Sequence, residues 1–285
     1  MTAVRTVPST LRREWATVSV AVSVLLVGGA ALLSYVVTGG IPLVDTGLSG
    51  TWTPGVGTRW FLPAATVAAF ELWFCFRYLG ANRPDGSGNR AAADATDRPV
   101  SVYESLGVPN LVTLSRGGLF AALAGFGALA PRAEIAWLPA LLYGGGCALD
   151  FVDGFLARRT GRRTVLGAKL DLAFDTTGFL VAPVVAVLWG QLPVWYLSLS
   201  AARYLFKLGR GVRRRRGRSV SDLPDSVVRR PLAGLQMVFI TLALTPLLSP
   251  ATARPLAAVV LAPSLAVFVR DYAVVAGWRS GRTSD

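Results

Sequence analysis

The sequence predicts an all-α integral membrane protein, with a core of six transmembrane helices preceded by two extra transmembrane helices. Three observations lead to this prediction. Hydrophobic residues make up 53% of the 285 residues and the mean hydropathy is +0.50, which is more apolar than a water-soluble domain of this length. Apolar segments of about 20 residues, the length that crosses a bilayer, recur along the chain. Basic residues gather in alternate gaps between these segments.

The first apolar segment, 15–37, follows three arginines and lacks a polar region with a cleavage site after it. We therefore interpret it as a transmembrane helix and not as a signal peptide. Seven further apolar segments predict the other helices, at 57–79, 109–130, 134–157, 170–190, 192–208, 231–249 and 253–276. The segment 192–208 is the weakest of them, because it is short and carries two basic residues near its end.

The residues between the second and third apolar segments have a different composition. From Ala81 to Arg98 the chain is rich in Gly, Ala, Asp and Arg and has no apolar periodicity, which is typical of a flexible linker. We expect three parts: an N-terminal two-helix membrane unit at 1–80, a flexible cytoplasmic linker at 81–99 and a six-helix core at 100–285.

The net charge of +13 is unevenly distributed along the chain. If the N-terminus is cytoplasmic, the outer gaps keep only Arg59, Arg132 and Arg254, and all other basic gaps lie inside. This asymmetry predicts a multi-pass protein of the cell membrane with both termini in the cytoplasm. Basic loops of membrane proteins face anionic lipid headgroups, so we expect membrane lipids as partners and no nucleic acid.

The residue types restrict the chemistry that the chain can perform. It contains no histidine, and its two cysteines, Cys75 and Cys147, lie in apolar runs typical of small core residues. Acid–base or metal chemistry must therefore depend on carboxylates.

Four carboxylates, Asp150, Asp153, Asp171 and Asp175, fall at the cytoplasmic ends of two consecutive apolar helices. An aspartate at mid-membrane costs about 2.5–3.5 kcal/mol, so the cluster needs a compensating cation. At about 100° per residue, the first two share one helical face and the last two share another, and the two faces can converge. Carboxylates without His or Cys favour Mg²⁺, Mn²⁺ or Ca²⁺ and suit phosphoryl chemistry.

Small residues stand among these acids. Gly154 and Ala157 follow the first pair and Gly167 precedes the second, so a bulky ligand could approach the backbone beside the carboxylates. Two other interpretations stay open. The acids could form interfacial salt bridges with neighbouring basic residues, namely Arg158, Arg159, Arg162 and Lys169. They could also mark the cation or proton pathway of a transporter, which would explain the acids but not the small residues.

The string Asp150-x2-Asp153-Gly154-x2-Ala157-Arg158-x8-Gly167-x3-Asp171-x3-Asp175 resembles the signature of the CDP-alcohol phosphotransferase (phosphatidyltransferase) family, with every specified position and gap filled. Residues 109–116, PNLVTLSR, are similar to the beginning of the family's first core helix. The resemblance covers about residues 100–277 and leaves out the first two predicted helices.

This resemblance implies a homodimer of six-helix cores, each with a cavity open to the cytoplasm and the bilayer. It implies a metal-dependent enzyme that moves a phosphoalcohol group from a CDP-linked donor to an acceptor alcohol and releases CMP. Asp150, Asp153 and Asp171 would hold Mg²⁺ or Mn²⁺ against the CDP diphosphate. Asp175 would be the general base and a further metal ligand. The remaining CDP-binding positions would be Gly154, Ala157, Arg158 and Gly167, with Arg158 near the phosphates.

Two branches of the family differ in their substrates. We favour a phosphatidyl-type transfer from a CDP-linked lipid donor such as CDP-diacylglycerol, because the core is a single unit and resembles microbial members. The alternative is a CDP-aminoalcohol transferase with a lipid acceptor. The acceptor would be a small alcohol or a phosphorylated alcohol. Arg203, Lys207 and Arg210 share one predicted helical face and could hold an acceptor phosphate, or they only anchor the basic loop Arg213–Arg216.

Two lone charges lie at membrane depth: Arg116 is a candidate to reach the aspartate cluster and Glu71 to face a helix interface. Intramembrane prenyltransferases also bind Mg²⁺–diphosphate through aspartates, but they would show two separated Asp-rich motifs, whereas these acids form one compact string. A carboxylate-lined transporter or a non-catalytic membrane scaffold are the non-enzyme alternatives.

Overall fold

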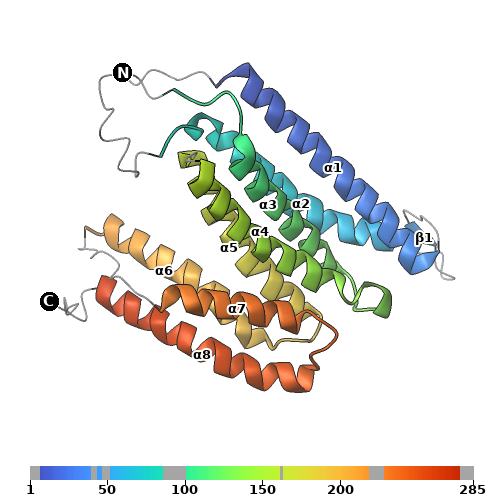
Figure 1. Ribbon diagram of the computed structural model, residues 1–285. Coiled ribbons are helices and arrows are strands. Elements are labelled where there is room, and N and C mark those ends of the chain that lie inside the picture. Colours follow the sequence, from blue (N-terminus) through green and yellow to red (C-terminus); the bar gives the residue numbers. More distant parts are fainter. Residues whose placement is uncertain are drawn as a thin grey trace. The chain divides into compact units, whose positions relative to one another are not determined.

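The computed structural model describes residues 7–39, 44–46, 52–85, 101–160, 163–217 and 228–276, without the side chains of 44–46, 52–54, 153, 156–158, 160 and 207. Nearly all of this part of the chain is helical (Figure 1), which confirms the all-α class. Its α-helices are α1 (Ser9–Thr38), α2 (Val56–Tyr78), α3 (Gly107–Gly125), α4 (Leu138–Thr160), α5 (Val165–Leu188), α6 (Ser198–Arg215), α7 (Arg229–Ala243) and α8 (Pro250–Val275).

Short elements connect the helices. Between α1 and α2, strand β1 (Val44–Thr46) pairs antiparallel with β2 (Trp52–Pro54). Single 3₁₀ turns extend or precede four helices; they are η1 (Leu79–Ala81) after α2, η2 (Phe126–Ala128) after α3, η3 (Ala133–Ile135) before α4 and η4 (Val194–Leu197) before α6.

Five of the helical segments are long and apolar enough to cross a membrane, namely Ser9–Thr38, Gly107–Ala128, Ala133–Val152, Val165–Leu188 and Pro250–Val275. These spans confirm a multi-pass membrane protein. The expected count of eight spans stays a prediction for the other three helices. Among these, α7 has 15 residues, short of the about 20 that a bilayer core requires. Helix α2 carries three charged residues, and α6 ends in a run of arginines.

Large apolar side chains cover the outside of these helices. On α1, Leu25 is 72% exposed, and on α8, Val259 is 69% exposed. In water such surfaces would be unfavourable, whereas hydrocarbon chains solvate them without cost. The apolar exterior therefore agrees with a position in the bilayer.

The first of two compact units comprises residues 1–182. In it, α1 packs on α2, α2 on α3 and α3 on α4. The buried core joins residues of α1, α2, η1, α3 with its preceding residue, and α5; it consists of Leu11, Cys75, Leu79, Leu106, Leu114, Leu166, Leu170 and Phe174. Helices α1 and α2 approach closely at Gly57, whose backbone N–H donates to Ser34 Oγ (3.0 Å) and whose missing Cβ leaves room for the carbonyl oxygen of Ala30. Thus the N-terminal pair is packed against the following helices.

The second unit comprises residues 183–285 and contains α6, α7 and α8, with α6 and α7 both packed on α8. A buried polar network holds it: the Tyr196 hydroxyl donates to Gln236 Oε1, and Gln236 Nε2 donates to Ser264 Oγ (2.9 Å). Asp271 on α8, 4% exposed, pairs with Arg229 on α7. These contacts use the polar residues of the unit to join its helices.

One helix boundary differs from that predicted. Helix α6 begins at Ser198 and runs to Arg215, so most of the expected basic loop 213–216 is helical. Arginine is a good helix former, and cations are favourable in the last turn of a helix. Along the chain, the division between the two compact units falls inside α5, before Pro183, a residue that cannot donate the backbone hydrogen bond of a helix. The division into 1–80, 81–99 and 100–285 stays a prediction, since most of the linker lies outside the described residues.

Candidate active site: an aspartate cluster beside a polar cavity

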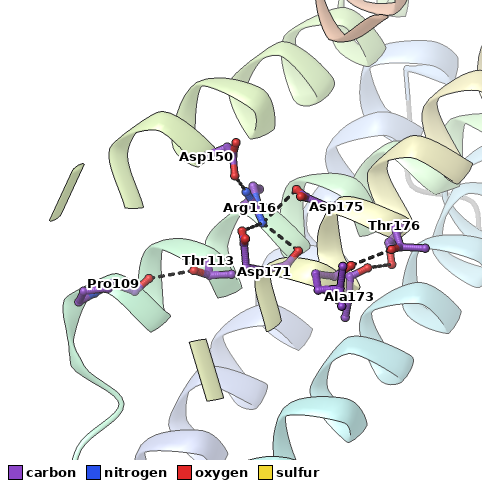
Figure 2. A network of polar contacts seen from close by, with 10 residues as sticks. Pro109, Thr113, Arg116, Asp150, Asp171, Ala173, Asp175 and Thr176 are labelled. Atoms are coloured by element: carbon purple, nitrogen blue, oxygen red, sulfur yellow. Dashed lines mark hydrogen bonds and ion pairs between the residues drawn. The ribbon is translucent and has the colours of Figure 1, made fainter. Parts of the chain in front are cut away.

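Three of the four predicted aspartates come together in the first unit. Asp150 lies near the middle of α4, and Asp171 and Asp175 lie one turn apart on α5. One carboxylate oxygen from each residue lies within 4.8 Å of the others (Figure 2). On α5, Leu170 and Phe174 face the core while the acids, one position further on, face the cluster. The two helical faces converge as their spacing predicts.

Arg116 of α3 joins these acids. Its side chain is 1% exposed, and its guanidinium contacts all three carboxylates. Nη1 donates to Asp150 Oδ1, and Nη2 lies 2.6 Å from Asp171 Oδ1 and 3.4 Å from Asp175 Oδ1 (Figure 2). The acids themselves are half-buried, with side chains 30–48% exposed. A buried guanidinium thus neutralises part of the charge of a cluster that opens to the outside.

The interpretation of the acids as salt bridges to neighbouring basic residues stays open for Arg158 and Arg162, because the side chain of Arg158 and the whole of Arg162 lie outside the described residues. Within the described part of the chain, the three acids form ion pairs with Arg116, which is 34 residues or more from each acid in the sequence. Two of the neighbouring basic residues contact aromatic rings instead: Lys169 Nζ lies 4.6 Å from the ring centroid of Tyr78, and the guanidinium of Arg159 lies 4.9 Å from that of Phe155. The three carboxylates of the cluster therefore share Arg116 as an ion-pair partner.

A cavity of about 220 Å³ lies beside the cluster and includes Asp171 in its wall. The small residues Gly154 and Gly167 line it, as their lack of a side chain predicts. Its lining residues are Asp85, Pro109, Asn110, Thr113, Gly154, Arg163, Thr164, Gly167, Ala168 and Asp171. A ligand in this cavity would contact hydroxyl, amide, carboxylate and guanidinium groups together with bare backbone.

One wall of the cavity is fixed by a buried polar junction between α3 and the start of α5. Asn110 Nδ2 donates to Thr164 Oγ1 (3.3 Å), which accepts a further hydrogen bond from the backbone N–H of Gly167 (2.8 Å). A Cβ at Gly167 would lie 2.6 Å from Asn110 Oδ1. Glycine is therefore required here by the contact with Asn110 as well as by the space that it leaves for a ligand.

Several predicted site residues stay predictions. The side chains of Asp153, Ala157 and Arg158 on α4, and of Lys207 on α6, lie outside the described residues. Arg203 and Arg210 lie on α6 in the second unit, whereas the aspartate cluster belongs to the first.

Sequence reasoning did not assign site roles to Asn110, Thr113, Thr164 and Asp85, all of which line the cavity. Asn110 and Thr113 lie in the PNLVTLSR segment, so that segment was the signal that pointed to them. Thr164 and Asp85 carried no comparable signal, because single polar residues in connecting segments are common. Glu71, as expected, faces a helix interface: it is 3% exposed, and its Oε2 faces Gly117 of α3.

Together, the fold and the site define a multi-pass membrane protein that presents clustered carboxylates to a polar cavity. Comparison with protein families then places it. The family model of the CDP-alcohol phosphatidyltransferases matches residues 106–270, more than half of the chain, so the chain belongs to this family. No curated protein and no solved structure matches it. Members transfer a phosphoalcohol group from a CDP-alcohol, and the chain is accordingly a transferase of phospholipid biosynthesis.

The family is metal-dependent in general, and the donor set fits a hard divalent cation. Asp150, Asp171 and Asp175 each offer a carboxylate oxygen within a common 4.8 Å, and histidine and cysteine ligands are absent from this group. Oxygen donors of this kind suit Mg²⁺ or Mn²⁺. Among the described residues, the one guanidinium that contacts all three carboxylates carries a single positive charge, so a dication is attracted to the acids that it only partly neutralises.

Replacing Arg116 with Gln is expected to destabilise the metal-free protein by about 1–3 kcal/mol. Removing one partner of a buried ion pair costs more than this, but the three carboxylates are partly solvated. Adding Mn²⁺ should restore much of the loss, because the cation neutralises the same carboxylates. Thermal unfolding in detergent, with chelator and with Mn²⁺, measures both effects against Arg132→Gln, an exposed control. An equal loss of Tm in both conditions would show that Arg116 acts by packing alone.

Proposed function

We propose that the protein is a metal-dependent phosphatidyltransferase that uses a CDP-linked lipid donor, such as CDP-diacylglycerol, and a small alcohol or phosphorylated alcohol as acceptor. One observation carries this proposal: three carboxylates converge within 4.8 Å beside a cavity that glycines keep open. The membrane-spanning helices around the site suit a donor whose acyl chains stay in the bilayer while its headgroup enters the cavity.

In this proposal Asp150, Asp153 and Asp171 hold Mg²⁺ or Mn²⁺, and Asp175 contributes a further ligand. When bound, the cation neutralises the diphosphate of the donor and the charge that grows on departing CMP. Gly154, Ala157 and Gly167 leave room for the nucleotide. Arg158 is proposed to stabilise the negative charge of the donor phosphates through its guanidinium.

Asp175 is the proposed general base. The acceptor hydroxyl oxygen attacks the phosphorus that carries the lipid alcohol, the bond from that phosphorus to the CMP oxygen breaks, and the hydroxyl proton passes to the Asp175 carboxylate. The ion pair of Asp175 with Arg116 is the longest of the three, at 3.4 Å against 2.6 Å for Asp171. A longer ion pair competes less with a hydrogen bond from the acceptor hydroxyl, which supports the choice of Asp175.

The acceptor subsite is proposed at Arg203, Lys207 and Arg210, where a phosphorylated alcohol would be held by charge-assisted hydrogen bonds. We further propose that the protein works as a homodimer in the cell membrane, with the site and both termini in the cytoplasm. The proposed orientation follows from the basic gaps of the sequence.

The orientation predicts how positions before and after α3 react with a labelling reagent. With Cys75 and Cys147 replaced by alanine, a cysteine at Ser101 should be protected from a membrane-impermeant maleimide in intact cells, whereas one at Arg132 should react. Both positions are exposed in the structure, so access depends on the side of the membrane. Permeabilised cells provide the control in which both should react. The reverse pattern in intact cells would place the site outside.

The function is tested by incubating purified protein with CDP-diacylglycerol, Mg²⁺ or Mn²⁺, and serine, glycerol phosphate or inositol phosphate. CMP release that depends on both metal and one acceptor supports the proposal. Release only with a CDP-aminoalcohol and diacylglycerol would assign the protein to the other branch of the family. Release with neither donor would leave the transporter or scaffold interpretation.

A further inference from the structure

Residues 82–85, which we call the strap, cross the cavity wall. The strap lies outside the family match, which begins at residue 106. It forms an antiparallel bridge with the connection between α4 and α5, in which Pro84 pairs with Thr164. The backbone N–H of Asp85 donates to the carbonyl of Arg163 (3.0 Å), and that of Val165 donates to the carbonyl of Arg83 (3.0 Å). The strap is thus held on one side by backbone hydrogen bonds.

Asn82 fixes the beginning of the strap. It is 0% exposed, and its side chain donates to the carbonyl of Ser105 (2.8 Å) and accepts from Asn110 Nδ2 (3.2 Å). Its own carbonyl accepts from the backbone N–H of Tyr103 (2.7 Å). The strap is thus held by the α4–α5 connection through its backbone and by residues 103–110 through Asn82. These contacts give Asp85, at the end of the strap, a defined position in the cavity wall.

Asp85 and Asp171 line the same cavity. A carboxylate repels a phosphate unless a cation lies between them, and the proposed cation ligands are Asp171 and its neighbours in the cluster. The diphosphate of a CDP-linked donor therefore belongs at the Asp171 side. The remaining half of the nucleotide, the nucleoside, is neutral and carries hydrogen-bond donors. It is the part of the donor that an anionic acceptor group in the cavity wall can bind.

We propose that Asp85 is a specificity-determining residue that accepts a hydrogen bond from the exocyclic amine of the donor's cytosine. This inference rests on the proposed function and deepens it. Cytosine presents an amine where uracil presents a carbonyl oxygen, and aspartate is a suitable acceptor for that amine. Opposite uracil, the carboxylate would face a second acceptor and neither group would be satisfied. Arg163, which also lines the cavity, can donate to the acceptor atoms of the cytosine ring.

The test measures nucleotide binding and not turnover. Calorimetric titration of the purified full chain with CMP, UMP and 2′-deoxy-CMP, in Mg²⁺, gives the ratio of CMP to UMP affinity. In Asp85→Ala this ratio should fall about 10-fold to 100-fold, because a charge-assisted hydrogen bond is lost. In Asp85→Asn the fall should include tighter UMP binding, since the amide can donate to the uracil oxygen. Removing a charge near phosphates changes both affinities alike, so the ratio isolates the base.

Glu104→Gln is the matched control, because Glu104 is exposed and does not line the cavity. It should leave the ratio unchanged. A variant of Asp85 that keeps the wild-type ratio overturns the proposal, and so does one that changes only the discrimination against 2′-deoxy-CMP, which would place Asp85 at the ribose. Wild-type protein that binds neither CMP nor UMP would instead contradict the proposed function, a result separate from any effect of the variants.

Discussion

Asp171→Asn is expected to reduce CMP release at least about 10³-fold and to weaken Mn²⁺ binding. The change keeps the shape of the side chain but replaces an anionic ligand with a neutral amide. Loss of metal would remove several kcal/mol of transition-state stabilisation, and each 1.4 kcal/mol is a factor of ten in rate. Asp150→Asn should behave alike, since its carboxylate belongs to the same group. Asp153→Asn should follow the same pattern if its side chain is the third ligand.

CMP-release kinetics and Mn²⁺ calorimetry on the same preparations measure these effects. Both Asp150 and Asp171 also pair with Arg116, so thermal unfolding must show that the variants are folded. Glu134→Gln, which removes an exposed carboxylate on η3, controls for loss of charge alone. Folded variants that keep wild-type turnover would refute the metal assignment.

Asp175→Asn should separate turnover from metal binding. If Asp175 is the base, transfer should fall by about 10²–10⁴-fold while CMP and Mn²⁺ still bind, because general-base catalysis contributes about that much. Some metal affinity should be lost, since a negative charge beside the cation disappears. This loss should be smaller than in Asp171→Asn, because a direct ligand contributes more than a neighbouring charge.

Calorimetry measures the Mn²⁺ affinity of the two variants, and kinetics measures their rate of CMP release. Equal loss of Mn²⁺ affinity in Asp175→Asn and Asp171→Asn would make Asp175 chiefly a ligand. The proton of the acceptor would then pass to another group. A variant that loses turnover but retains metal and CMP supports the base.

The convergence of Asp150, Asp171 and Asp175 could be predicted because helical periodicity places the acids on one face of each helix and the connection between the two helices is short. Their spacing places them on helical faces whatever the rest of the chain does. The partnership with Arg116 could be suspected from the sequence, but the sequence alone could not establish it. It depends on how α3 packs on its neighbours, and a single charge in an apolar helix carries no periodic signal.

The helices themselves were predictable where apolar runs are long. Helix α6 was predicted only as far as residue 208, because residues 209–215 are mostly basic and resemble a loop, although arginine sustains a helix. The strap was also missed as a cavity wall. Its composition is that of a flexible segment, and its order comes from Asn82, whose partners at Ser105 and Asn110 lie more than 20 residues further along the chain.

The strap has a consequence for protein engineering. A shortened chain that starts at the family match would lose Asn82 together with the two N-terminal helices. The side-chain amide of Asn110 would then lose the acceptor that Asn82 provides. If the shortened chain retains Ser105, the carbonyl of Ser105 would lose the donor that Asn82 provides. Exchange of the N-terminal pair between relatives would therefore succeed only when the incoming segment ends in an equivalent amide. The six-helix part that can be transplanted therefore has to include the strap, and the recombination point belongs ahead of Asn82.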